Sequence, residues 1–255
     1  MNAIALARRG RRPAARVMAA WAAWAYRAAR AAGMAHAAPA AFVLAALCLL
    51  PGPATAAEAG SAADAAPETT ASVSAMVYAL PDQENFGVGV GAVNRGPWRL
   101  EARVNYEALD SGSLFLGRRW AGTARPTDGA EEDSWSFEAT PMLGVAFGSI
   151  RAVVPALLAS VGWRSFDLYV EAEYVRDLDD ADASFFYAWS ELGWSPVDWL
   201  RVGLVGQRTR LVASERSLQR GAFAQILLGR ATLSAYAFNP EASSRYFVFG
   251  LTVAF

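Results

Sequence analysis

Ten charged residues stand at every second position of segments that otherwise alternate with apolar residues, and they are the side chains best placed to do chemistry. They are Arg99, Glu101, Arg103, Glu107, Glu138, Asp167, Glu171, Glu173, Glu191 and Arg201. In an extended chain alternate residues share one face. These seven carboxylates and three guanidiniums are therefore predicted to line an inner surface, opposite an apolar outer one.

The excess of carboxylates allows two interpretations. In an open passage, rings of carboxylate attract cations. The alternative, which we favour slightly, is an internal network of ion pairs that fills and stiffens the interior. Most of the ten residues lie in the segments 98–108 and 166–175, so the choice depends on which segments face them across the interior.

Catalysis is not expected. Nucleophilic and acid–base enzymes of the Ser-His type need an imidazole that moves protons near neutral pH. The only histidine, His36, lies in an N-terminal stretch that is expected to be removed. Glu171 and Glu173 could in principle form a paired-carboxylate hydrolase, but two carboxylates on one face without a recognised cleft are more typical of a charged lumen. No catalytic residue is predicted.

No metal ion or cofactor is predicted either. The only cysteine, Cys48, is also N-terminal, which excludes thiolate sites and disulfides from the rest of the chain. The four aspartates of the segment 177–182 could hold calcium, but the segment lacks the glycine and the final glutamate of a twelve-residue calcium loop. A solvated acidic tip is the preferred interpretation.

Three glycines alternate in the segment 86–93, at Gly87, Gly89 and Gly91. They lack the G-x-G-x-x-G spacing and the following helix of a nucleotide site. We expect them on the inner face, where they either leave room for a ligand or, as we prefer, let the strand bend.

The first 56 residues differ from the remainder. They contain seven arginines and no acidic residue, and an apolar run at 40–50 precedes Pro51-Gly52-Pro53 and Ala54-Thr55-Ala56. This order is typical of a cleaved secretory signal, and the run is about half the roughly 20 residues that a spanning helix needs. Residues 57–71 are expected to form a flexible periplasmic leader. The remaining chain has 24 acidic residues and 16 arginines, a net charge of −8, which argues against a nucleic-acid partner.

After residue 71 the hydrophobic period is two, and no helical stripe is found. Twelve alternating segments lie near 72–80, 85–94, 98–108, 112–121, 135–147, 155–163, 166–175, 184–195, 199–209, 218–228, 231–239 and 245–255. They predict one all-β domain over 72–255, an antiparallel transmembrane barrel of twelve strands, with ten as the alternative. The alternative is kept because the long acidic connection 122–134 falls on the side where turns should be short.

A secreted β-sandwich would show the same alternation, so other residues must decide. Six tryptophans stand beside predicted periplasmic turns, where an indole suits a membrane interface. They are Trp98, Trp120, Trp135, Trp163, Trp194 and Trp199. Five aromatic residues at the opposite ends are expected to form a second girdle: Tyr106, Phe147, Tyr174, Phe186 and Phe247. The C-terminal Phe255 resembles the residue by which outer-membrane barrels are recognised for insertion.

Several segments are similar to a group of uncharacterised, porin-like outer-membrane proteins. The similarity rests on residues 101–113 (EARVNYEALDSGS), 137–144 (FEATPMLG), 185–191 (FFYAWSE) and 195–209 (SPVDWLRVGLVGQRT). This resemblance implies a barrel in the bacterial outer membrane and brings no activity with it.

The expected partners are outer-membrane lipid, the barrel-assembly machinery and small solutes or ions. The expected function is passive, a cation-preferring channel for small solutes. A plugged structural barrel without conductance is the alternative.

Overall fold

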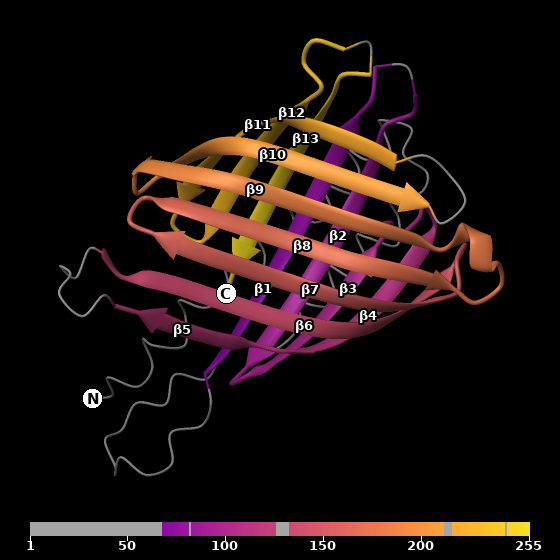
Figure 1. Cartoon of the computed structure of the whole chain (residues 1–255), viewed down its shortest axis with the longest axis horizontal. Helices are drawn as coiled ribbons and strands as arrows, with labels where there is room; N and C mark the ends of the chain where they lie inside the picture. The colour runs from indigo at the N-terminus through magenta and orange to yellow at the C-terminus, as the bar shows by residue number, and fades with distance from the viewer. Residues whose placement is uncertain (1–67, 82, 126–132, 212–215, 243) are drawn as a thin grey trace, which may run out of the picture.

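The computed structural model describes residues 68–81, 83–125, 133–211, 216–242 and 244–255, and these form one closed antiparallel β-barrel (Figure 1). The predicted presequence and residues 57–67 of the predicted leader lie outside the described residues. Strand β1 already begins at Thr69, three residues before the expected start of the barrel.

Consecutive strands pair with each other, except that β4 pairs with β6 and not with β5, and β1 pairs with β13 to close the sheet. The strands are β1 (Thr69–Ala79), β2 (Phe86–Arg95), β3 (Trp98–Val104), β4 (Ser111–Arg118), β5 (Trp120–Ala124), β6 (Trp135–Gly148), β7 (Ala152–Trp163), β8 (Phe166–Asp177), β9 (Phe185–Val197), β10 (Leu200–Leu211), β11 (Arg216–Leu228), β12 (Ala231–Phe238) and β13 (Tyr246–Ala254).

Strands β4 and β5 occupy one position in the barrel, because both pair with β6 and only Arg119 separates them. The barrel therefore has the predicted twelve strands. The connection expected at residues 122–134 is shorter in the structure, because β5 pairs with β6 as far as Ala124.

Connections differ in length between the two ends of the barrel. At one end, which we call the short-turn end, residues 96–97, 164–165, 198–199 and 229–230 form two-residue turns. Both Thr69 and Phe255 lie at this end, and only the connection after β5 is long there. The opposite end, the loop end, carries the remaining connections.

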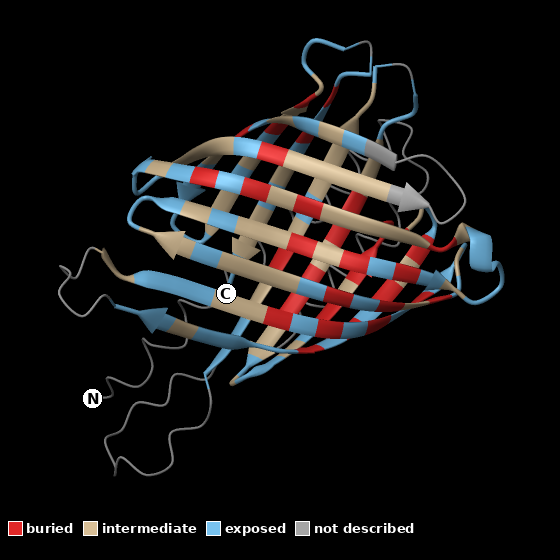
Figure 2. Cartoon of the chain, in the orientation of Figure 1, coloured by how far each residue is buried: buried red, intermediate tan, exposed pale blue. Residues whose placement is uncertain are grey.

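Alternation along each strand separates the two faces of the sheet, as the bands of burial in Figure 2 show. On β4, Ser113 and Phe115 are buried, whereas Leu114 and Leu116 are exposed. Leucines are among the most exposed residues, with 61% exposure at Leu143 and 63% at Leu204. A β-sandwich buries its large apolar side chains between two sheets, so this outward apolar face excludes the sandwich.

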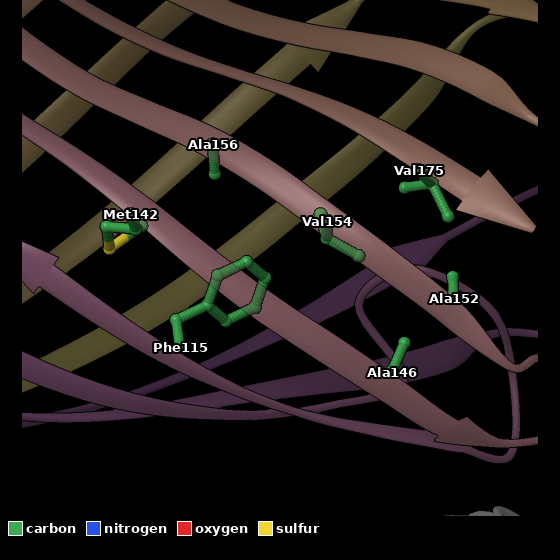
Figure 3. Packing of buried hydrophobic residues seen from close by; sticks show 7 residues of the cluster. All are labelled: Phe115, Met142, Ala146, Ala152, Val154, Ala156 and Val175. Atoms are coloured by element: carbon green, nitrogen blue, oxygen red, sulfur yellow. The ribbon is translucent and has the colours of Figure 1, made fainter.

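Apolar side chains also pack inside the barrel. One cluster joins β4 to β8 and contains Phe115, Met142, Ala146, Ala152, Val154, Ala156 and Val175 (Figure 3). A second joins β9 to β13 and contains Trp189, Val205, Phe223, Tyr236, Phe238, Tyr246 and Val248. The interior is thus partly filled by side chains rather than uniformly polar.

Two predictions about faces are wrong. Val90 lines the interior and pairs with Ser74, which also lines it, so Gly87, Gly89 and Gly91 face outward. The apolar members of β2 point inward, and a period of two cannot say which face is which.

The second error concerns Tyr106, which was expected in an outer girdle. Strand β3 ends at Val104 because Asn105 and Asp110 adopt positive φ angles of 56° and 60°, which start and end a turn. The turn folds Tyr106 into the lumen, where its ring packs edge-on against Tyr187 at 6.3 Å.

Within the described residues, no helix has the length and apolar character that crossing a membrane requires.

Candidate lumen site

Arg103 lies at the centre of the interior charges. Its Nε donates to Glu101 at 2.6 Å, and its Nη1 donates to Glu173 at 2.9 Å. Glu171 lies 3.1 Å and Glu107 3.7 Å from the same Nη1 atom. One guanidinium, 2% exposed, is therefore shared by four carboxylates.

Aromatic rings and a second arginine complete this cluster. The guanidinium carbon of Arg103 lies 4.4 Å from the ring centre of Tyr106 and 4.3 Å from that of Phe115, which are cation–π distances. Arg99 donates through Nε to Glu101 at 2.8 Å. With two guanidiniums and four carboxylates, the cluster has a formal charge of −2 when all groups are ionised.

A second cluster forms around Arg201 on β10. Its Nε donates to Asp167 on β8 at 2.9 Å, across the intervening strand β9. The pair passes over Gly193, where a Cβ would lie 2.5 Å from Arg201 Nε and 2.6 Å from Asp167 Oδ1. The absence of a side chain at Gly193 therefore lets the two strands share an ion pair.

Glu191 links Arg201 to the aromatic side of the lumen. Arg201 Nη1 donates to Glu191 Oε2 at 2.5 Å, and Trp189 Nε1 and Tyr236 Oη donate to Glu191 Oε1 at 3.0 and 2.9 Å. Gln225 accepts from Arg201 Nη1 and donates to Tyr236 Oη, both at 3.0 Å. In this series of hydrogen bonds each donor has a charged or polar acceptor, and together the bonds fix the position of the Glu191 carboxylate.

Two buried carboxylate oxygens accept no hydrogen bond within the described structure. They are Oε2 of Glu107 and Oε1 of Glu171. Glu171 Oε1 lies near Arg103 Nη1, but without the angle that a hydrogen bond requires. Buried acceptors without donors are uncommon in folded proteins, so these atoms mark where the interior charges are incompletely satisfied.

A cavity of about 320 Å³ lies between the two clusters. Its charged lining consists of Arg99, Glu101, Arg103, Glu171 and Glu191. Its aromatic lining consists of Tyr78, Tyr106, Tyr169, Trp189 and Tyr236. The site can therefore present carboxylate and aromatic groups to one small solute.

An aromatic layer bounds this cavity toward the loop end. Tyr78 stacks on Phe86 with ring centres 4.6 Å apart, and Tyr246 stacks on Phe238 at 4.7 Å. Tyr246 Oη is held by Gln207 at 3.0 Å and by Gln219. A second cavity of about 350 Å³ lies at the loop end and shares Tyr78 with the first.

The tenth predicted lumen residue, Glu138, lies apart from both clusters. It is 3.5 Å from Arg119 near the short-turn end, and both side chains are 43% exposed. Of the four aspartates at 177–182, Asp182 lies within the short 3-10 helix Ala181–Ala183, Asp180 caps its start, and the other two precede it. Asp177 accepts from the backbone of Asp179 and Asp180, and no group suited to a metal ion occurs among the described residues.

The six tryptophans of the predicted girdle all lie toward the short-turn end, and five are strongly exposed. Arg118 lies over two of their rings, 5.9 Å from the ring centre of Trp98 and 5.5 Å from that of Trp120. Phe255 lies at the same end, where its N–H donates to the carbonyl of Ala71 at 2.8 Å and extends the β1–β13 pairing.

The sequence did not single out the inner aromatic residues, including Trp189, Phe223, Tyr236 and Tyr246. Toward the loop end of β12 and β13 both faces carry apolar or aromatic residues, with Phe238 and Val248 inside and Phe247 and Phe249 outside, so alternation cannot distinguish the faces there. One available signal was that Trp189 is the single tryptophan after residue 56 that stands far from any predicted turn.

No family model and no curated protein matches the chain. Among solved structures, the KdgM porin is similar over 72% of this chain and 99% of its own, with 8% identity and a TM-score of 0.46. CdiB from Acinetobacter baumannii covers 73% of this chain and 60% of its own, with 8% identity and a TM-score of 0.38. The translocator domain of the autotransporter NalP from Neisseria meningitidis covers 75% and 88%, with 11% identity and a TM-score of 0.29. At these values nothing about function passes from those proteins to this chain.

Proposed function

We propose that this chain is a bacterial outer-membrane barrel whose lumen passes small solutes and prefers cations. The outward face supports a lipid environment, because large apolar side chains such as Leu143 and Leu204 are more than half exposed. A membrane barrel presents such a band of apolar residues to lipid, with aromatic residues at its borders. Trp98, Trp120 and Arg118 supply an interfacial border of this kind at the short-turn end.

The observation that carries the cation preference is the sharing of Arg103 by four carboxylates. Arg99 adds one further positive charge, so the wall of the inner cavity remains acidic. Carboxylates that line a narrow passage attract cations and repel anions. In the low-dielectric interior of a barrel this effect is stronger than in bulk water.

A second candidate function is a structural barrel without conductance. The aromatic layer of Tyr78, Phe86, Phe238 and Tyr246 favours it, since Tyr78, stacked on Phe86, lines both cavities. Tyr246, stacked on Phe238, lines the cavity at the loop end. In this alternative the ion pairs only stiffen the interior.

Single-channel recording in planar bilayers tests the proposal. We expect discrete conductance steps and, under a gradient of potassium chloride, a reversal potential on the cation side. A silent bilayer with correctly folded protein would favour the structural barrel. An anion-selective pore would contradict the assignment of the inner face.

A further inference from the structure

We infer that the lumen cavity is a binding site for a small organic cation carrying an ammonium group, held by Glu171 against aromatic side chains. This site deepens the proposed passage and rests on it, because it names the class of solute that the lumen would take. The cavity of about 320 Å³ is at the lower end of the range of ligand pockets, which suits a compact solute.

The first argument is an unsatisfied acceptor. Glu171 is 8% exposed and lines the cavity. Its Oε2 lies 3.3 Å from the hydroxyl of Tyr169, which donates to it, whereas Oε1 accepts no hydrogen bond. Oε1 already lies 3.1 Å from Arg103 Nη1, so what it lacks is a hydrogen-bond donor rather than a positive neighbour. An ammonium group has three donors and no acceptor, so it would supply that hydrogen bond.

The second argument is that the guanidiniums of the cavity wall are already engaged. Arg103 donates to Glu101 and Glu173, and Arg99 donates to Glu101 and Asn94. An anion would have to displace one of these carboxylates. A cation, in contrast, offsets the negative charge that the shared arginines leave.

The third argument is the aromatic wall, which favours an organic cation over a metal ion. Tyr106, Tyr169, Trp189 and Tyr236 line the same cavity. Aromatic faces attract ammonium and guanidinium groups, and an alkyl chain gains from contact with apolar surface. Among the described residues, no group of acidic side chains has the spacing that holds a metal.

The test uses folded protein in detergent and n-butylammonium as the probe, titrated by calorimetry at constant ionic strength in sodium chloride. We expect saturable binding of n-butylammonium and none of 1-butanol or butyrate, which have the same chain length. Glu171→Gln should weaken binding by about tenfold or more, as expected for the loss of a charged hydrogen-bond acceptor. The matched control is Glu138→Gln, a carboxylate outside the cavity, which should leave binding unchanged.

A second variant keeps the test valid if Glu171→Gln does not fold. Ser234 also lines the cavity, and Ser234→Met should fill part of it without altering any charge, so binding should be lost. Equal binding of butyrate, or unchanged binding in both cavity variants, would overturn the site.

Measuring both n-butylammonium binding and conductance distinguishes failure of the binding site from failure of the proposed passage. Binding of n-butylammonium in detergent by a barrel that is silent in bilayers would support the site and remove the passage. Conductance without any binding of n-butylammonium would support the passage and overturn the site.

Discussion

Arg103 Nη1 on β3 lies 2.9 Å from Glu173 Oε2 on β8, although these strands are not neighbours in the sheet. The two segments that supply most of the interior charge therefore meet inside the barrel. The two interpretations of the sequence, an ion-pair network and an acidic lumen, therefore hold together. Arg103 forms the ion pairs, and its carboxylate partners outnumber the arginines. Within this cluster both features depend on Arg103, whereas the ion pairs of Arg201 are separate from it.

Removal of Arg103 should be strongly destabilising. In Arg103→Leu, four buried carboxylates lose their shared partner, and breaking a buried ion pair from one side costs about 3–5 kcal/mol. Urea unfolding in lipid vesicles would measure this loss. Arg119→Leu is the matched control: its ion pair with Glu138 is about half exposed, so it should cost about 0–1 kcal/mol. Equal losses in the two variants would contradict a central role for Arg103.

Much of the barrel could be predicted from the alternation of residue types. Trp98 to Val104 and Trp135 to Phe147 form strands whose faces are as predicted, with Glu101 and Arg103 buried and Leu100 and Leu143 exposed. The prediction failed where a strand ends. Asn105 was expected on the inner face of a strand, but its positive φ begins a turn that carries Tyr106 inward.

The site was less predictable than the fold. The charged residues were identified, but the partners of Arg103 and Arg201 depend on which strands curve toward each other, and no local pattern contains this. Gly193 illustrates the difficulty, because its role is to let Arg201 reach Asp167 across β9. The glycines of β2 were misplaced for another reason: apolar Val88 and Val90 face inward there, against the usual pattern of a membrane barrel.

Arginine on the outward face should be costly in lipid. Leu143 lies on β6 between the exposed Trp135 and Phe147, and Leu143→Arg should cost roughly 2–4 kcal/mol if this is the middle of the membrane. Thr232 is a suitable control because it lines the acidic cavity, and Thr232→Arg should cost much less. Unfolding in vesicles of defined lipid measures both, and an equal tolerance of the two arginines would reverse the faces.

Cation selectivity should fall when the carboxylates of β8 are neutralised together. Glu171→Gln with Glu173→Gln removes two negative charges and keeps the size of both side chains. Arg103 retains Glu101 and Glu107 as partners, so the barrel should remain folded. The reversal potential under a salt gradient should move toward zero.

The same preference for cations should weaken in the wild type at high salt, where the screening length falls to about 3 Å at 1 M.

Glu138→Gln is the control for the double variant, because Glu138 lies outside both charge clusters and should affect selectivity less. An unchanged reversal potential in the double variant would mean that the β8 carboxylates do not face permeating ions.

The aromatic layer should limit conductance, and its removal distinguishes a narrow passage from a plugged barrel. Tyr246 stacks on Phe238, lies 6.3 Å from Tyr78 between ring centres, and is fixed through its hydroxyl by Gln207. Tyr246→Ala should open a connection between the two cavities that meet at Tyr78. Single-channel conductance should therefore rise.

The matched control for this variant is the adjacent Phe247→Ala, since Phe247 is exposed on the outward face and stacks there on Phe249. Its conductance should equal that of the wild type. If the wild type is silent and Tyr246→Ala conducts, the layer is a plug. If both conduct and the variant conducts more, the layer is a constriction in an open passage, because current already flows past the tyrosine. If Tyr246→Ala leaves the current unchanged while the barrel stays folded, the route of ions does not pass between Tyr78 and Tyr246, and the cavity at the loop end is not its entrance.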